Sequence, residues 1–213
     1  MADKEKKKEK KIAGFKEFDS AKYIELEPTI DEARSLKGGA GSGTAVVAWG
    51  RMNPITIGHE KLVNKVIAVA RDNKAVPHIF LSHSQDAKKN PLSHAEKIKF
   101  GQQAFGRVVT SSNAKTIIEL MKVLDNQFKN VILVAGSDRI KEFETLLNKY
   151  NGKEYKFADI KVVSAGERDP DGDSVSGMSA SKMRQYAAAD DIVNFVAGLP
   201  KKLKKTGDKV MAA

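Results

Sequence analysis

The sequence predicts an α/β protein built on a doubly wound, five-stranded parallel sheet with helices on both faces. From Thr44 onward, short β-rich runs alternate with longer stretches of helical periodicity, which is the pattern of βαβ units. The length of 213 residues, of which 41% are hydrophobic, is sufficient for one substantial core. No internal repeat is evident. Together these observations favour a single Rossmann-like domain.

The expected strands are the short β-rich runs, and the expected helices lie between or after them. The strands are expected at residues 44–49, 76–82, 107–110, 130–135 and 160–164. The helices are expected to begin near Gly58, Ser93, Ala114, Ser137 and Ser179. The third helix carries Ile117, Ile118, Met121 and Leu124 at amphipathic spacing, so one of its faces should be apolar.

The formal net charge of +10 is concentrated at the two ends of the chain. Residues 1–12 carry six Lys and three acidic residues, whereas residues 201–213 carry five Lys and one Asp. We therefore expect a basic extension with a Gly-rich linker at 1–43, a folded domain at 44–200 and a solvated basic tail at 201–213. A contact of these ends with nucleic acid or an acidic partner stays open, but no nucleic-acid-binding motif supports it.

Composition also excludes several kinds of chemistry. The chain has no cysteine, so disulfides, thiolate nucleophiles and Cys-ligated metals are ruled out. Its apolar runs, such as residues 76–81, are too short to span a bilayer, and no apolar segment follows the Lys-rich start. We expect a cytoplasmic protein without a membrane partner.

The most informative segment is 48–60, between the first expected strand and the first expected helix. Its polar residues should lie at the carboxyl end of the sheet, where open α/β folds bind ligands. Gly50 and Gly58 allow the backbone to approach a phosphate closely, because they lack a Cβ atom. Thr56 and His59 can place a hydroxyl and an imidazole beside the same phosphates.

A second polar segment, 176–186, precedes the last expected helix. Ser179 is suited to cap the N-terminus of this helix, which leaves Ser181 and Arg184 on its first turn. The guanidinium of Arg184 is planar, stays protonated and can bind two phosphate oxygens at once. Both segments therefore predict phosphate binding where a strand leads into a helix.

The remaining histidines carry no such pattern. His83, at the end of the second expected strand, is expected to line the cleft. His78 and His94 have no partner at a functional spacing, so we interpret them as structural or exposed. Residues 169–173 resemble a calcium-ligand ladder, but no Glu follows at loop position twelve, which favours a polar turn.

Residues 50–59 resemble the Gly-x-Phe-x-Pro-x-His-x-Gly-His signature of the HxGH nucleotidyltransferase superfamily. Met52 replaces the Phe, and Thr56 replaces the first His, as is known in the pantetheine-phosphate branch. Residues 178–184 are similar to the superfamily motif Ile-Ser-Ser-Thr-x-Ile-Arg, with Ala180 in place of the central Ser. The two motifs occur in the order that the superfamily requires.

Further segments resemble nicotinamide-nucleotide adenylyltransferases most closely. The loop at 84–93 contains Lys88 and Lys89, and Glu96 and Lys97 fill the pattern of the helix after it. The resemblance implies that Lys89 reaches a phosphate. The segment Gly136-Ser137-Asp138 resembles the family segment near the nucleotide base and ribose.

This resemblance implies site roles and a reaction. His59 and Thr56 would face the α- and β-phosphates of a triphosphate, Ser181 and Arg184 the β- and γ-phosphates, and Arg51 the remaining charge. The implied reaction joins ATP and nicotinamide mononucleotide to give NAD and pyrophosphate. Mg²⁺ would arrive with the triphosphate, and no dedicated protein metal site is expected.

Several alternatives stay open at this point. A cytidylyltransferase or a pantetheine-phosphate adenylyltransferase is the enzymatic alternative. Domains resembling this one also occur among bacteriophage proteins, so a virion-associated structural or assembly role is the alternative of another class. The protein would then reside in the host cytoplasm or the virion. The sequence also leaves open a homo-oligomer.

Overall fold

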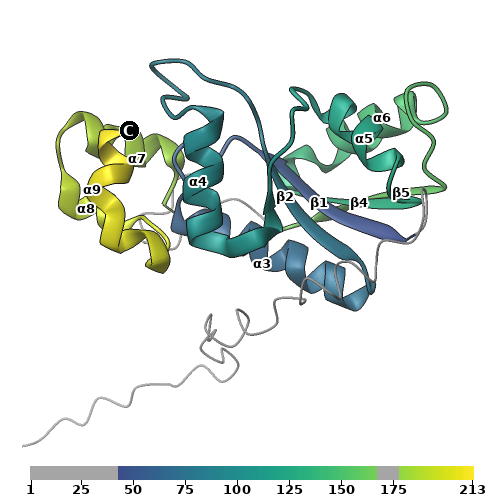
Figure 1. Ribbon diagram of the computed structural model, residues 1–213, viewed down its shortest axis with the longest axis horizontal. Coiled ribbons are helices and arrows are strands. Elements are labelled where there is room, and N and C mark those ends of the chain that lie inside the picture. The colour runs from purple at the N-terminus through teal and green to yellow at the C-terminus, as the bar shows by residue number, and fades with distance from the viewer. Residues whose placement is uncertain (1–42, 167–177) are drawn as a thin grey trace, which may run out of the picture. The chain divides into compact units, whose positions relative to one another are not determined.

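The computed structural model describes residues 43–166 and 178–213, and it confirms the predicted fold class. Five parallel strands form one sheet in the order β3-β2-β1-β4-β5 (Figure 1). These strands are β1 (Thr44–Gly50), β2 (Val76–Leu81), β3 (Val109–Thr110), β4 (Asn130–Ala135) and β5 (Asp159–Ser164). The expected N-terminal extension, apart from Gly43, and the expected polar turn at 169–173 lie outside the described residues.

Helices cover both faces of the sheet, as the sequence predicts. They are α3 (Ile57–Asp72), α4 (His94–Phe105), α5 (Ile117–Asp125), α6 (Ile140–Tyr150), α7 (Ala180–Ala188), α8 (Ile192–Ala197) and α9 (Gly207–Ala212). Helices α3 and α4 lie on one side of the sheet, and α5 and α6 lie on the other (Figure 1). Apolar side chains of α3, α4 and α7–α9 belong to one core cluster, and those of α5 and α6 belong to a second. Alternate residues of β1 serve the two cores: Val46 faces the first, and Val47 faces the second.

The chain order explains this division of the helices. From β1 the chain proceeds outward to β2 and β3, then returns across the sheet to β4 and continues to β5. Helices α3 and α4 connect the first half, whereas α5 and α6 connect the second half. The direction of winding therefore changes between β1 and β4. Ligands of doubly wound sheets bind at the carboxyl ends of the strands beside such a switch point.

Side-chain caps set where two helices begin. At α4, Ser93 Oγ accepts from Glu96 N at 3.3 Å, and Glu96 Oε2 accepts from Ser93 N at 2.8 Å. This capping box fixes the start that the sequence predicts. Helix α5 begins at Ile117, later than the expected Ala114, because Thr116 is its N-cap and Thr116 Oγ1 accepts from Glu119 N at 3.2 Å.

Two expected elements are shortened by 3₁₀ turns. Residues Gly106–Val108 form one turn, so β3 contains only Val109 and Thr110 rather than residues 107–110. Gly106 has a φ of 76°, a conformation that glycine adopts without strain, and here the chain leaves α4. A second turn, Ser137–Arg139, precedes α6, which is why that helix begins at Ile140 instead of Ser137.

The expectation of a solvated tail at 201–213 is wrong. Residues Lys201–Thr206 form a 3₁₀ helix, and α9 follows it directly. Leu203 is fully buried and Val210 is 3% exposed, and both belong to the core that α3 and α4 share. The lysines of this segment are exposed. The sequence prediction gave weight to the lysines and not to the apolar residues between them. The lysines and the buried residues occupy different sides of the same helices.

Gly198, just after α8, brings the C-terminal helices against the start of α3. Its main-chain oxygen accepts from Ile57 N at 2.9 Å, so it satisfies one of the donors that a helix start leaves unpaired. A Cβ at this position would lie 2.3 Å from Met183 Sδ and 2.7 Å from Met178 Cγ. Only glycine lets these segments approach so closely.

If residues 201–212 belong to the core, Leu203→Ala will destabilise the whole domain. We expect a loss of about 2–5 kcal/mol in the free energy of unfolding, because the change leaves a cavity beside α4. Denaturant unfolding followed by circular dichroism measures it. The matched control is Val193→Ala, at a side chain that is 76% exposed, with an expected change within about 0.5 kcal/mol. Equal stabilities of the two variants would contradict the assignment.

Candidate functional site

Two polar segments leave the carboxyl ends of β1 and β2 side by side. Gly50 of β1 pairs with Leu81 of β2, and Ser82 N donates to Gly50 O at 2.9 Å, one residue beyond the strand. Residues 51–56 lead from this point into α3, and residues 82–93 lead into α4. The first predicted motif and the loop with Lys89 therefore leave adjacent strands at the same edge of the sheet.

Thr56 and His59 are hydrogen-bonded to each other at the start of α3. Thr56 is the N-cap, and its main-chain N donates to His59 Nδ1 at 2.9 Å. Thr56 Oγ1 lies 3.0 Å from the same nitrogen, and the residue is 1% exposed. Because a main-chain N–H can only donate, Nδ1 is the acceptor, and a neutral ring carries its hydrogen on Nε2. Buried Thr56 thus orients the imidazole.

The turn before α3 combines open space with backbone strain. A Cβ built on Gly50 would meet only Met52 Cγ, at 3.9 Å, so protein packing does not require glycine there. The space above Gly50 suits the close approach of a ligand. Met52 is 3% exposed and has a φ of 43°, in the left-handed region that non-glycine residues rarely adopt. Such strain is characteristic of ligand sites. Gly58, in the first turn of α3, is half-buried.

The second motif begins α7 and reaches the first motif through Arg184. Ser179 is the N-cap, and its Oγ accepts from Lys182 N at 3.2 Å. Arg184 Nη2 donates to Ser181 Oγ at 3.1 Å, and Arg184 Nη1 donates to Asn53 O at 2.7 Å. Arg184 and Asn53 are separated by 131 positions in the chain. The structure therefore brings the two predicted motifs together.

Positive charge gathers where the motifs meet. Burial and then the charge of Arg51 lower the pKa of Lys97, and the same two causes lower the pKa of Arg184. Asp86 opposes this effect at Arg184. Within residues 43–166 and 178–213, none of these three cations forms an ion pair with a carboxylate. An anionic ligand would supply the missing counter-charge.

Lys97 is completely buried, although it lies on the first turn of a surface helix. Its Nζ donates to Ser82 O at 2.5 Å and to Ser84 O at 3.0 Å. The ammonium therefore holds the beginning of the loop after β2. Lys89 lies in the same loop with its side chain exposed.

Asp86 shapes the turn that carries Lys89. Its Oδ1 accepts from Lys89 N at 2.6 Å, and its Oδ2 accepts from the Asn90 side chain at 2.6 Å. These bonds, that from Lys89 first, lower the pKa of Asp86. The lysine side chain is left exposed at a fixed point of the loop.

Gly136 and Asp138 lie at the carboxyl end of β4, on the other side of β1. A Cβ on Gly136 would lie 2.6 Å from Asp138 Oδ1, so the carboxylate folds back over the glycine. Asp138 is exposed. Both residues therefore occupy the expected edge of the sheet, beyond the switch point.

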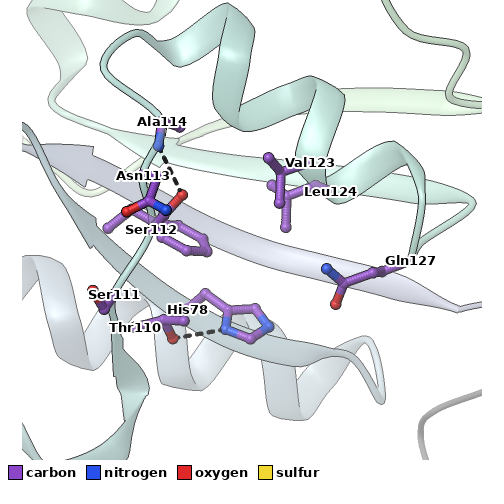
Figure 2. A pocket seen from close by; sticks show the side chains of 10 residues that line it. His78, Thr110, Ser111, Ser112, Asn113, Ala114, Val123, Leu124 and Gln127 are labelled. Atoms are coloured by element: carbon purple, nitrogen blue, oxygen red, sulfur yellow. Dashed lines mark hydrogen bonds between the residues drawn. The ribbon is translucent and has the colours of Figure 1, made fainter.

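A pocket of about 460 Å³ lies elsewhere, between β2, the loop after β3 and α5 (Figure 2). Its lining is uncharged and includes none of the predicted site residues: His78, Phe80, Thr110, Ser111, Ser112, Asn113, Ala114, Val123, Leu124 and Gln127. His78 Nδ1 lies 3.0 Å from Thr110 Oγ1 on the pocket floor. His78 is thus a partly buried floor residue. The chemistry predicted for the motifs needs charge, which this pocket lacks.

His83 and His94 stack with their ring centroids 3.7 Å apart. His83 Nε2 lies 2.7 Å from Ser112 O, which can only accept, so this nitrogen carries hydrogen. Burial, the neighbouring His83 and Lys97 lower the pKa of His94. His83 thus links the loop after β2 to the loop after β3.

Sequence reasoning missed two residues that organise the site. Asn53 carries no pattern of its own in the first motif, yet it is 2% exposed and its side chain is hydrogen-bonded to Leu92. Lys97 filled a family pattern, but its complete burial was unexpected for a lysine. A signal for Lys97 did exist, because the apolar positions Ile98 and Phe100 beside it place it near the inner face of α4.

The described residues contain no group of three or more His, Asp or Glu side chains that could hold a metal ion. None of their helices is both long and apolar enough to cross a membrane. Comparison of the chain with models of known protein families gives no match, and comparison with curated proteins gives none either.

The partly buried imidazole of His78 will make stability depend on pH. Burial lowers its pKa from 6.5 to about 4, so between these values the unfolded chain binds a proton that the folded protein does not. Stability should therefore fall as the pH falls from about 6.5 to about 4. His78→Gln should reduce this fall, although His94 continues to contribute. Denaturant unfolding from pH 7.5 to pH 4 measures both proteins, and identical slopes would refute the assignment.

Proposed function

We propose that this protein is a nucleotidyltransferase that transfers a nucleoside monophosphate from a triphosphate to a phosphorylated acceptor. One observation carries the proposal: Arg184 of the second motif reaches Asn53 of the first motif at 2.7 Å, and within the described residues Arg51, Lys97 and Arg184 form no ion pair with a carboxylate. A cluster of this kind costs folding free energy unless an anion neutralises it. The starts of α3 and α7 add helix dipoles that favour negative charge at the carboxyl edge of the sheet.

The mechanism is positioning and charge stabilisation. An oxygen of the acceptor phosphate attacks the α-phosphorus, a new P–O bond forms, and the bond to the β-phosphate oxygen breaks to release pyrophosphate. No general base is needed, because a phosphate acceptor is already ionised at neutral pH. The residues contribute by holding the reacting groups in line and by stabilising charge in the transition state.

Each residue has a role in this scheme. His59 Nε2–H, in the orientation set by Thr56, donates to the α- and β-phosphates. Ser181 and Arg184 bind the β- and γ-phosphates, and Arg51 and Lys89 neutralise the remaining charge. Ser179 fixes the start of α7, and Gly50 and Gly58 give the phosphates access to the backbone. Mg²⁺ enters with the triphosphate.

The substrates we propose are ATP and nicotinamide mononucleotide, which give NAD. The support for this choice is the resemblance of the loop at 84–93 and of Gly136-Ser137-Asp138 to nicotinamide-nucleotide adenylyltransferases. Gly136 and Asp138 lie beyond the switch point from the cationic cluster, where a base and ribose could extend from the phosphates. Asp138 is exposed and able to accept from ribose hydroxyls.

The role of Arg184 gives a direct test. Arg184→Ala should lower kcat/KM for ATP about 10²–10³-fold, because it removes a donor to charge that develops in the transition state. Pyrophosphate release with ATP and nicotinamide mononucleotide is the measurement. Arg71→Ala is the matched control, since Arg71 is exposed and its ion-pair partner is the adjacent Asp72. Unchanged activity of Arg184→Ala would exclude the assigned role.

Substrate choice is tested with pairs of triphosphate and acceptor. We expect turnover with ATP and nicotinamide mononucleotide to exceed that of CTP with phosphorylated acceptors. The reverse ranking would make the protein a cytidylyltransferase. Turnover of ATP with phosphopantetheine as the only productive acceptor would assign the other adenylyltransferase reaction. Absence of pyrophosphate with every pair, together with co-sedimentation with a large particle, would replace the enzymatic proposal with a virion-associated structural role.

A further inference from the structure

Asn53 is a buried polar residue to which the proposed reaction assigns no task. Its side chain pairs with the main chain of Leu92, 39 positions later: Oδ1 accepts from Leu92 N at 3.1 Å, and Nδ2 donates to Leu92 O at 3.0 Å. This two-bond pairing requires one donor and one acceptor on the same planar group, which asparagine provides and aspartate does not. The contact therefore depends on residue identity.

The main chain of Asn53 makes a second long-range contact. Its oxygen accepts from Arg184 Nη1 at 2.7 Å, while Arg184 Nη2 donates to Ser181 Oγ at 3.1 Å. A guanidinium has five N–H groups in one plane. Two of its nitrogens thus have protein acceptors that define the plane, and its other N–H groups have no acceptor among the described residues.

Leu92 belongs to a segment that is held at both ends. It directly precedes Ser93, the N-cap of α4, and is 2% exposed. The beginning of the segment is held by Lys97, which donates to Ser82 O and Ser84 O. Asn53 holds the end of it. Lys89 lies between these two anchors.

We propose that Asn53 is a positioning residue that aligns the Arg184 guanidinium with the loop at 82–92. Its side chain fixes the turn at residues 50–54 to Leu92, and the turn then presents the Asn53 oxygen to Arg184. Both cationic segments are thereby directed at one polyphosphate. This inference rests on the proposed function, because it assigns Asn53 to the same phosphate site.

The test is a double-mutant cycle with Mg²⁺–ATP as the probe. Asn53→Ala should weaken ATP binding about tenfold, because the guanidinium loses its fixed plane. In the Arg184→Ala background the same change should weaken ATP binding about threefold or less, since only the loop with Lys89 is then left to misalign. Isothermal titration calorimetry gives the dissociation constants. An equal loss in both backgrounds, or no loss in either, would overturn the proposal.

Two controls separate positioning from folding. Unfolding free energies of all four proteins should show that each is folded under the conditions of the titration, so that weaker ATP binding does not reflect unfolded protein. If Asn53→Ala fails to fold, Asn53→Leu takes its place, because it keeps about the same side-chain size and removes both hydrogen-bonding groups without adding a charge. The same non-additive pattern in ATP binding is expected for it, and additivity would count against the proposal.

A measurement without nucleotide distinguishes this inference from the proposed function. Rotation about the Cζ–Nε bond of Arg184, followed by NMR of the arginine side chain, should be slow in the wild type and faster in Asn53→Ala. Unchanged rotation would refute the positioning role even if ATP binds. Conversely, faster rotation in a protein that does not bind ATP would uphold the positioning role and refute the phosphate site that it was proposed to serve.

Discussion

The site depends on how buried polar groups are satisfied in the turn between β1 and α3. A polar group removed from water costs free energy unless it finds a hydrogen-bond partner. Asn53 finds its partners in Leu92 and Arg184, and Ile57 N finds its partner in Gly198 O. These partners come from three other parts of the chain. Pairing the polar groups of this one turn therefore fixes the loop before α4, the N-terminal half of α7 and the segment after α8 around the same point.

This arrangement explains why so much positive charge is tolerated in one place. Lys97 loses its water on burial, but two main-chain oxygens replace it, so its ammonium is solvated by the loop that it holds. Asn53 O and Ser181 Oγ likewise accept hydrogen bonds from the Arg184 guanidinium. These acceptors are neutral, so they satisfy the donors without cancelling the charge, and the carboxylate of Asp86 offsets part of the charge at Arg184. A carboxylate in their place would compete with an anionic ligand for the same cations.

The C-terminal helices complete the core as well as the site. Leu203 and Val210 belong to the same apolar cluster as Val63 and Phe100, which lie on α3 and α4. Gly198 permits the close approach that puts its oxygen on the start of α3. The helix that carries the second motif is thus anchored through its neighbours to the helix that carries the first. Packing in this region and the geometry of the proposed phosphate site are consequently linked.

The sequence alone determined the five parallel strands, the helices from α3 to α7 and the positions of the two motifs. Those features depend on local periodicity and on turn and cap chemistry, which neighbouring residues encode. Starts at Ile117 and Ile140 were missed because a single cap or a 3₁₀ turn moves a boundary by a few residues. Only the tertiary structure revealed the partners of Asn53, the burial of Lys97 and the packing of residues 201–212. Each of these depends on segments far apart in the chain, and no local pattern specifies which donor will meet which acceptor.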